Sequence, residues 1–207
     1  MKLTKYKHAC VRLSKDGKEL LVDPGIWAED EVFDGVDAIL VTHEHFDHLD
    51  ADRVKASGLP IWTNAGVAAE LGPELADRIT VVKGGESFEA AGFQISAYGN
   101  DHAIILPELG VPCQNVGYLI EDAVYHPGDS FTKPDREVHT NLVPISGPWF
   151  TLPGAVSYVR EVAAQQTIGI HDALLSEIGL TMGERWVGGQ GGKPYLALTP
   201  GDSIEIS

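Results

Sequence analysis

The segment Thr42–His48, which reads Thr-His-Glu-His-Phe-Asp-His, places several candidate metal ligands within a few residues. His43 and His45 lie two residues apart, so in extended or tightly turning backbone their side chains point the same way and can bind one cation. Asp47 and His48 follow, where they can face a second cation next to the first. Imidazole nitrogen and carboxylate oxygen are ligands that Zn²⁺ favours. The segment therefore indicates a metal site, against the alternative of a solvated polar loop with incidental histidines.

This segment resembles the His-x-His-x-Asp-His signature of the metallo-β-lactamase superfamily, and four further motifs resemble those of the same superfamily in the same order. They are Asp23-Pro24 after an opening hairpin, Asp101-His102, the run 125–130 that ends in Gly128-Asp129-Ser130, and the strand-then-histidine run 168–171. Five motifs in the right order are much stronger evidence than any one alone.

The resemblance implies a single domain over residues 1–207, with an α/β fold in which two mixed β-sheets flanked by helices form a four-layer αββα sandwich. It also implies seven metal ligands in three groups: His43, His45 and His102 on a first ion; Asp47, His48 and His171 on a second ion; and Asp129 bridging the two ions. The expected cofactors are two divalent cations, with Zn²⁺ as first choice and Mn²⁺ or Fe²⁺ as alternatives.

The activity implied is that of a metal-dependent hydrolase, in which a hydroxide shared by the two ions cleaves an ester, lactone or phosphodiester bond of a small molecule. Two carboxylates are expected to be catalytic: Asp129 by fixing the metal spacing, and Asp47 by helping to orient the hydroxide. The residues 27, 46, 106–112 and 148–152 adjoin the motifs and are expected to wall the substrate pocket.

Length and motif details are similar to those of the small metal-dependent hydrolase branch, which includes ascorbate-phosphate lactonase and N-acylphosphatidylethanolamine phospholipase D. Phe46 stands where the superfamily often has glycine, and no cysteine stands where the cysteine-liganded β-lactamases need one. His45 speaks against the flavin-partnered di-iron branch, which has glutamate there. Ser146 and the Trp149-Phe150 pair depart from the usual loop of this branch, so the resemblance does not assign a substrate to this chain.

Other polar residues suggest supporting roles. Asp23 is expected to orient a ligand histidine, since metal-bound imidazoles usually need such a partner. His8 and His126 lie within strand patterns and are expected to be core or supporting histidines rather than ligands. His139 is expected to be exposed.

Two other classes of function stay open at this point. One is a mononuclear iron dioxygenase acting on a thiol or persulfide, which could leave Asp47 and His48 off the metal. The other is a metal-binding protein without catalysis. A nuclease is the weakest option, because the chain lacks the usual insertions and has a strongly acidic average charge.

The elements that must position these residues follow from the apolar pattern. Residues 3–13 and 19–23 are predicted to be strands around an Asp16-Gly17 turn. Further strands are predicted at 37–42, 61–63, 79–82, 87–90, 93–98, 116–120, 123–126, 142–145, 168–170 and 203–206. Helices are predicted at 50–57, 65–71 and 153–165, and Gly188–Gly192 is expected to be a loop. Strands with hairpin turns in each half predict two packed sheets with helices outside.

Composition bounds the partners. The 207 residues carry a formal net charge of −15, and a surface of this charge repels nucleic acid. We therefore expect a small-molecule substrate as the partner. The sequence does not indicate an oligomeric state. No apolar run approaches the ~20 residues that span a bilayer, and the N-terminus lacks an apolar signal core, so we expect no membrane insertion and a cytoplasmic location. The two cysteines, Cys10 and Cys113, are expected to be reduced thiols.

Overall fold

Two β-sheets of seven strands each form the centre of the computed structural model, which describes residues 1–206. The first sheet has the strand order β14-β1-β2-β3-β4-β5-β6, with bounds β14 (Ser203–Glu205), β1 (Lys2–Lys5), β2 (Val11–Lys15), β3 (Lys18–Val22), β4 (Ala38–Val41), β5 (Ile61–Thr63) and β6 (Ile79–Val81). The second has the order β13-β12-β11-β10-β9-β8-β7, with bounds β13 (Tyr195–Leu196), β12 (Gln166–Ile170), β11 (Thr140–Pro144), β10 (Val124–His126), β9 (Gly117–Ile120), β8 (Phe93–Tyr98) and β7 (Ser87–Ala90).

Each sheet is mixed. Strands β3 to β6 run parallel to one another, as do β10 to β13, and the remaining neighbours are antiparallel. Because β8 and β10 both pair antiparallel with β9, these two strands run in the same direction. The carboxyl ends of β8, β10 and β12 therefore meet at one edge of the second sheet.

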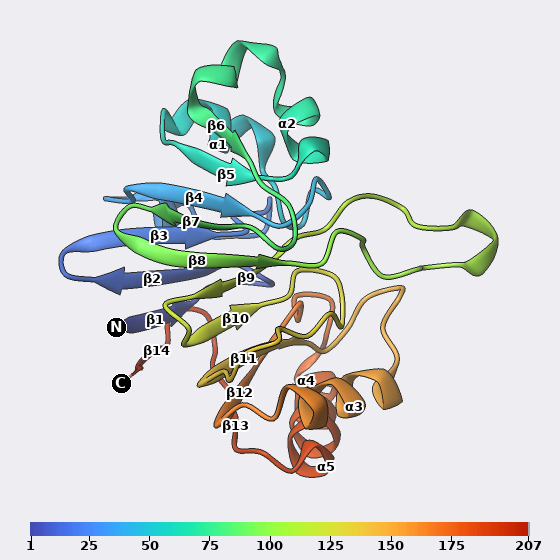
Figure 1. Cartoon of the computed structure of the whole chain (residues 1–207). Helices are drawn as coiled ribbons and strands as arrows, with labels where there is room; N and C mark the ends of the chain where they lie inside the picture. The colour runs from blue at the N-terminus through green and yellow to red at the C-terminus, as the bar shows by residue number, and fades with distance from the viewer. Residues whose placement is uncertain (207) are drawn as a thin grey trace.

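Helices cover the outer face of each sheet, which gives the predicted four-layer αββα sandwich (Figure 1). The helices α1 (Ala51–Ser57) and α2 (Ala65–Leu71) lie on the first sheet, and α3 (Leu152–Val162), α4 (Glu177–Gly183) and α5 (Gly189–Gly191) lie by the second. Apolar side chains alternate along the strands to serve both faces: Leu20 and Val22 of β3 join the core between the sheets, while Leu21 packs toward the helices.

Local signals set the helix ends. Asp50 and Asn64 accept hydrogen bonds from the backbone N–H groups of Arg53 and Val67, so each caps the helix that follows it. The helices predicted at 50–57 and 65–71 are thereby confirmed. The third helix ends at Val162 rather than at residue 165, because Ala163 adopts a left-handed φ of 55°.

Two predictions of local structure are wrong. Residues 3–13 are not one strand, because a turn between β1 and β2 interrupts them and contains His8. Gly188–Gly192 is not a loop: it continues α4 through a π-helical turn (Glu184–Gly188) into α5. A Cβ at Gly191 would lie 2.6 Å from the Val159 side chain, so these glycines permit close packing on α3 rather than looping.

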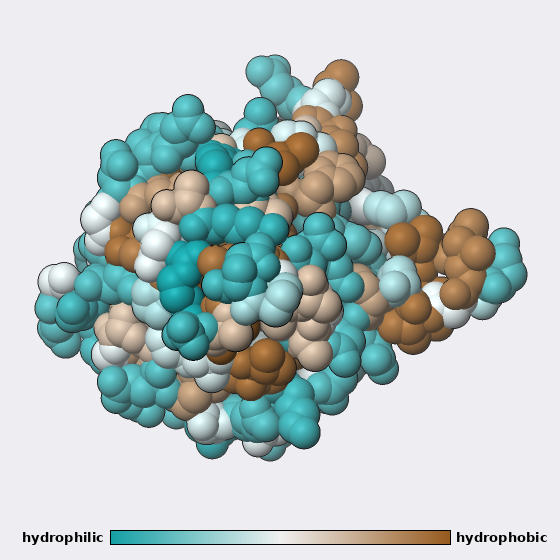
Figure 2. Space-filling view, turned by 90° about the horizontal axis from the view of Figure 1, so that it is seen from above, coloured by the Kyte–Doolittle hydropathy of each residue, from teal (hydrophilic) through white to brown (hydrophobic). Residues whose placement is uncertain are grey.

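The β8–β9 connection forms an arm that projects from the body of the molecule (Figure 1). Its tip exposes apolar side chains, which gather there in the space-filling view (Figure 2); they include Leu106, Leu109 and Val111. None of the helices described over residues 1–206 has the length and apolar character of a membrane span.

Candidate metal centre

The seven residues predicted to bind metal lie together where four strands end. His43 follows β4, His102 follows β8, Asp129 follows β10 and His171 follows β12. The side-chain donor atoms form two groups, in each of which all atoms lie within 4.8 Å of one another. The groups are His43, His45, His102 and Asp129, and His8, Asp47, His48 and His171.

Asp129 faces both groups. Its Oδ2 atom lies 3.3 Å from His102 Nε2, in the first group, and 3.1 Å from His171 Nε2, in the second. Its Oδ1 atom lies 3.0 Å from His48 Nε2. In the first group, His43 Nε2 and His45 Nδ1 are 3.1 Å apart. This arrangement places one carboxylate between two sets of imidazole nitrogens.

Buried polar atoms test whether this donor set suits cations. The Nε2 atoms of His48, His102 and His171 and the Oδ1 atom of Asp129 are buried, close to one another, and without a hydrogen bond of proper geometry. An unsatisfied buried polar group costs about 1–3 kcal/mol, so a cluster of them needs a partner. Divalent cations that accept nitrogen and oxygen ligands fit the two groups.

The backbone is strained at three residues of this region. His8, Asp23 and His171 all adopt left-handed φ angles, of 66°, 49° and 60°. Such conformations are uncommon outside glycine, and they tend to cluster where a site needs a side chain in a particular direction. The peptide N–H of His171 donates to the carbonyl of His8, so two of these strained residues support each other.

Asp23 orients a histidine of the site, as predicted, and that histidine is His48. The fully buried carboxylate accepts hydrogen bonds from the backbone N–H and the hydroxyl of Thr42 and contacts Nδ1 of His48, all at 2.7 Å. Because Asp23 accepts the Nδ1 proton, Nε2 is the nitrogen of His48 that can bind a cation, and it is directed at Asp129.

Two polar side chains hold the turn that carries Asp129. Asn115 donates from Nδ2 to the carbonyl of Pro127 and accepts at Oδ1 from the backbone N–H of Asp129, both at 2.9 Å. His126 donates from Nε2 to the carbonyl of Ala9 and accepts at Nδ1 from the N–H of Gly128. Both ring nitrogens of His126 are engaged, so it is a supporting residue, as predicted. Nothing in the sequence signals the role of Asn115.

His8 joins the second group although its sequence position suggested a strand. Its Nδ1 atom accepts the backbone N–H of Ala173 at 3.2 Å, so the ring proton resides on Nε2, which contacts Asp47 Oδ2 at 3.1 Å. A nitrogen that carries a proton cannot bind a cation. His8 therefore holds Asp47 in position rather than acting as a ligand.

We expect His8→Ala to lower metal affinity in the second group by about 10–100-fold, because Asp47 loses its hydrogen-bond donor. His8→Gln should recover part of this loss, because the glutamine amide can still donate a hydrogen bond to Asp47. If His8 were a metal ligand, glutamine could not replace its imidazole and would recover nothing. Metal titrations of both variants provide the measurement. His139→Ala is the control, at a half-buried rather than exposed histidine outside the site. An equal loss in the Ala and Gln variants would contradict the supporting role.

Three further contacts at the site were not predicted. The Trp149 indole N–H donates to Asp129 Oδ2 at 2.8 Å. Cys113 Sγ lies 3.8 Å from His45 Nε2, and both cysteines are free, as predicted. Fully buried Lys5 pairs with Asp172 at 2.7 Å, beside His171. Each contact joins residues far apart in sequence, so no local pattern could have indicated it.

Two histidines of the site have a lowered pKa and two have a raised pKa. Burial lowers the pKa of His43 well below its usual value and lowers that of His45, so both rings are neutral. Burial also opposes protonation of His48, but the Asp129 and Asp23 carboxylates outweigh it and raise its pKa well above the usual value. The pKa of His171 is raised in the same way by Asp129 and Asp47.

Metal binding should therefore release protons. A cation can occupy His48 or His171 only after the imidazolium loses its proton, so affinity should be high above the raised pKa values and fall as the pH drops through them. The expected fall is about tenfold per pH unit for each proton displaced. Calorimetric Zn²⁺ titrations between pH 5.5 and 8.5, in buffers of different ionisation enthalpy, measure it. Affinity independent of pH over this range would contradict the assignment.

Gly25 brings two segments of the site into contact. A Cβ at this position would lie 2.0 Å from the backbone oxygen of Asp47. Gly25→Ala should therefore push the 47–48 backbone away, lower the free energy of unfolding by about 1–3 kcal/mol and weaken metal binding. Denaturant unfolding and metal titration measure both effects. Gly189→Ala, in helical backbone with open space, is the control and should stabilise slightly. Unchanged metal affinity in Gly25→Ala would contradict this reading.

The metal groups form the floor of a cavity of about 370 Å³. Trp27, Phe46, Pro148 and Trp149 line it, as predicted, and Ile105 and Leu174 complete its walls. The prediction is wrong for residues 150–152 and for residues 106–112, which are not among the described lining residues; the latter continue into the arm. The chain direction after Ile105 carries them away from the site.

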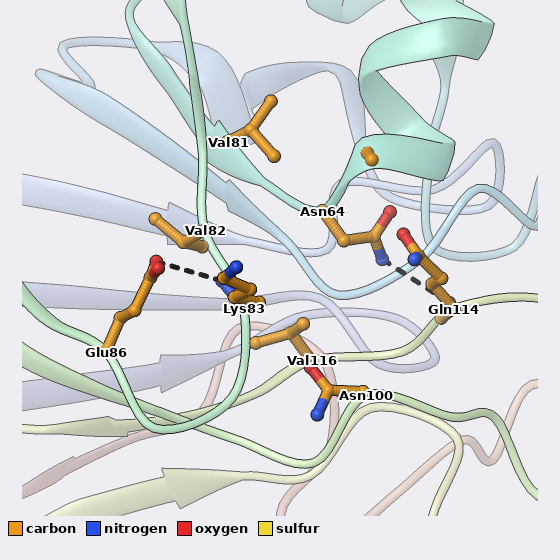
Figure 3. A pocket seen from close by; sticks show the side chains of 9 residues that line it. Asn64, Val81, Val82, Lys83, Glu86, Asn100, Gln114 and Val116 are labelled. Atoms are coloured by element: carbon orange, nitrogen blue, oxygen red, sulfur yellow. Dashed lines mark hydrogen bonds between the residues drawn. The ribbon is translucent and has the colours of Figure 1, made fainter.

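A second cavity, of about 400 Å³, lies beside Asn64, Lys83, Glu86 and Gln114 (Figure 3). Some of its polar groups are engaged locally: Asn64 Nδ2 donates to the Gln114 carbonyl, and the Lys83 backbone N–H donates to Glu86. Of the residues described as lining it, none belongs to the two metal groups. The cavity above the metal groups is therefore the candidate active site.

Similarity to known proteins agrees with this geometry. Residues 2–171 match the family model described as the beta-lactamase superfamily domain. The chain is 33% identical over 188 residues to Protein Rv0786c of Mycobacterium tuberculosis. This match covers 85% of this chain and 86% of that protein. The chain is also 29% identical over 234 residues to a UPF0173 metal-dependent hydrolase of Chelativorans sp., and this match covers 100% of this chain and 99% of that protein.

Among solved structures, Igni18, a metallo hydrolase of the archaeon Ignicoccus hospitalis, is similar with a TM-score of 0.76. The match covers 98% of this chain and 97% of that one at 19% sequence identity. At this identity the likeness shows the fold.

Proposed function

Since the chain belongs to the β-lactamase superfamily and is a metal-dependent hydrolase of its small-hydrolase branch, we propose a specific reaction for it. It uses two divalent cations to hydrolyse an ester, lactone or phosphodiester bond of a small molecule. Zn²⁺ is the proposed metal, because imidazole nitrogens supply three of the proposed protein ligands of the first cation and two of those of the second. The observation that carries the proposal is the position of Asp129 between the two groups.

The proposed ligands are His43, His45 and His102 for one cation, and Asp47, His48 and His171 for the other, with Asp129 between them. When bound, such a pair of cations supplies an acidified water as nucleophile and positive charge for the developing oxyanion. The described cavity lining has no serine, threonine or cysteine, so the chain offers no hydroxyl or thiol nucleophile of its own there.

The chain's own residues would set the geometry. Although burial opposes its charge, the neighbouring imidazoles of His171 and His8 hold the pKa of Asp47 far below its usual value, so this carboxylate is ionised and can orient a water. Asp129 is held on two sides, by Asn115 at its backbone and by Trp149 at Oδ2. Asp129 can therefore keep the two donor groups at a fixed separation.

The leaving group finds little help in the cavity. The protein donors on its floor are imidazoles and carboxylates already assigned to the cations. Esters and lactones need less protonation of the leaving atom than amides do, so they suit this site better. The dioxygenase alternative would leave Asp47 and His48 off the metal, whereas both lie within 4.8 Å of His171 as possible co-ligands. We therefore favour hydrolysis.

Metal removal and restoration test the proposal. Protein stripped with a chelator should lose hydrolysis of a panel of aryl esters, lactones and phosphodiesters, and two equivalents of Zn²⁺ or Mn²⁺ per chain should restore it. Full activity in the stripped protein would contradict the proposal. So would turnover that requires iron and consumes O₂, which would support the dioxygenase alternative, or no turnover of the whole panel at full metal loading.

A further inference from the structure

We propose that the substrate is an uncharged ester or lactone whose acyl part is apolar, an inference that rests on the proposed hydrolytic function and narrows its substrate class. It follows from the division of the cavity into a polar floor and apolar walls, and from the absence of lysine and arginine among the described residues that line it.

The polar side chains of the cavity are all on its floor. These are His45, Asp47, His102, Asp129 and His171, and each belongs to one of the two metal groups. The walls are apolar and come from separate segments: Trp27, Phe46, Ile105, Pro148, Trp149 and Leu174. A substrate therefore meets imidazole and carboxylate groups only where its scissile group meets the floor.

The aromatic walls present rings rather than polar atoms. Trp27 and Phe46 pack edge to face on one side, with centroids 5.6 Å apart. Trp149 uses its single polar side-chain atom, the indole N–H, to bind Asp129. Phe46 and Leu174 remain 58% and 60% exposed at the cavity. Large apolar side chains exposed beside a polar floor are typical of a ligand site that apolar groups cover.

The charge of the walls disfavours an anionic substrate tail. Sites that bind carboxylate or phosphate groups usually supply arginine or lysine, and the residues described around this cavity include neither. A charged tail lying against the walls would lose water without gaining a partner. The net charge of −15 adds repulsion at longer range. A volume of about 370 Å³ lies near the small end of the range for ligand pockets, so the substrate is small.

Matched aryl esters test the inference on the zinc-loaded full chain. p-Nitrophenyl butyrate and mono-p-nitrophenyl succinate share a leaving group and a four-carbon acyl chain, but the succinate ends in a carboxylate. After the uncatalysed rate, which the succinate's own carboxylate accelerates, is subtracted for each substrate, we expect kcat/KM for the butyrate to exceed that for the succinate at least about 30-fold. It should also exceed the value for the acetate about 15-fold, at about fourfold per added CH₂. Bis(p-nitrophenyl) phosphate should be the poorest substrate.

A wall variant makes the assignment specific to this cavity. Leu174→Lys places a cation on the wall and should lower the butyrate-to-succinate ratio at least tenfold. Val81→Lys, at a 54% exposed residue of β6 away from the metal groups, should leave the ratio unchanged. Titration calorimetry of butyranilide and succinanilic acid, the matched amides, gives a binding readout without turnover, and the neutral amide should bind at least tenfold more tightly.

The outcomes separate the inference from the function on which it rests. Metal-dependent hydrolysis that favours the succinate or the phosphodiester, or a ratio that Leu174→Lys does not change, would overturn the inference and leave the hydrolase intact. Hydrolysis that persists after metal removal, or no hydrolysis of any of these substrates at full zinc loading, would overturn the proposed function and the inference together.

Discussion

Asp129→Ala is expected to lower kcat/KM by at least about 10²–10³-fold and to weaken binding of both cations. The side chain lies within 3.3 Å of donor nitrogens from each metal group, so its loss removes the carboxylate that would link them. Removing one preorganised electrostatic group from an active site typically costs a factor of this size. Steady-state kinetics on an aryl ester and metal titration measure the two effects.

The control is Asp135→Ala. Asp135 is exposed and hydrogen-bonds to Tyr98 outside the site, so its removal should leave kinetics and metal binding unchanged. If Asp129→Ala kept two tightly bound cations and native kinetics, the bridging assignment would be wrong. If it lost only one cation and the other stayed with unchanged affinity, Asp129 would belong to one group alone.

The second large effect is expected at Asp23, which affects the site through His48. Asp23→Ala leaves the Thr42 N–H, the Thr42 hydroxyl and His48 Nδ1 without an acceptor in the core, and it places alanine at a left-handed φ. We expect the free energy of unfolding to fall by about 3–5 kcal/mol. Chemical denaturation of the metal-free protein measures this change.

Asp23→Asn separates the effect on metal binding from the loss of stability. Asparagine keeps the volume and tolerates the left-handed backbone, but it supplies fewer acceptor positions, so His48 should be less well held and metal affinity should fall about 10–100-fold. Asp16→Asn, the same change at an exposed aspartate with a φ of 52°, should shift stability by less than about 0.5 kcal/mol. Native metal affinity in Asp23→Asn would rule out the orienting role.

The sequence predicted those parts of the site whose chemistry restricts the residue type. Metal coordination requires histidine or carboxylate at fixed spacings, so His43, His45, Asp47 and His48 were recognisable in one segment. The strands that precede the other candidates were also predictable, because their apolar runs are continuous and bounded by turns. The long-range convergence of these segments followed from resemblance to a known family rather than from any local pattern.

The parts that could not be predicted depend on tertiary contacts. His8 reaches Asp47 across 39 positions of sequence only because a turn interrupts the first apolar stretch. Asn115 and Trp149 contact Asp129 from other loops, and neither residue type in isolation signals such a role. The glycines at 188–192 predict a loop, because composition alone does not distinguish a flexible segment from a closely packed one.

The arm after β8 is a segment that the sequence wrongly assigned to the site, whereas the contacts above were missed. Residues 106–112 adjoin a predicted ligand in sequence, so proximity along the chain suggested that they wall the pocket. The backbone instead leaves the site after Ile105, and the pocket wall is completed by Leu174, which follows β12. Adjacency in sequence was therefore a poor guide once the chain entered an irregular segment.

The most direct test of the two-cation centre is the metal content of the full chain purified without added metal, combined with zinc titration of the stripped protein. We expect two divalent cations per chain and two binding events, reduced by the Asp47→Ala and His48→Ala double variant. A single iron per chain, with no second site on titration and no effect of the double variant, would contradict the account.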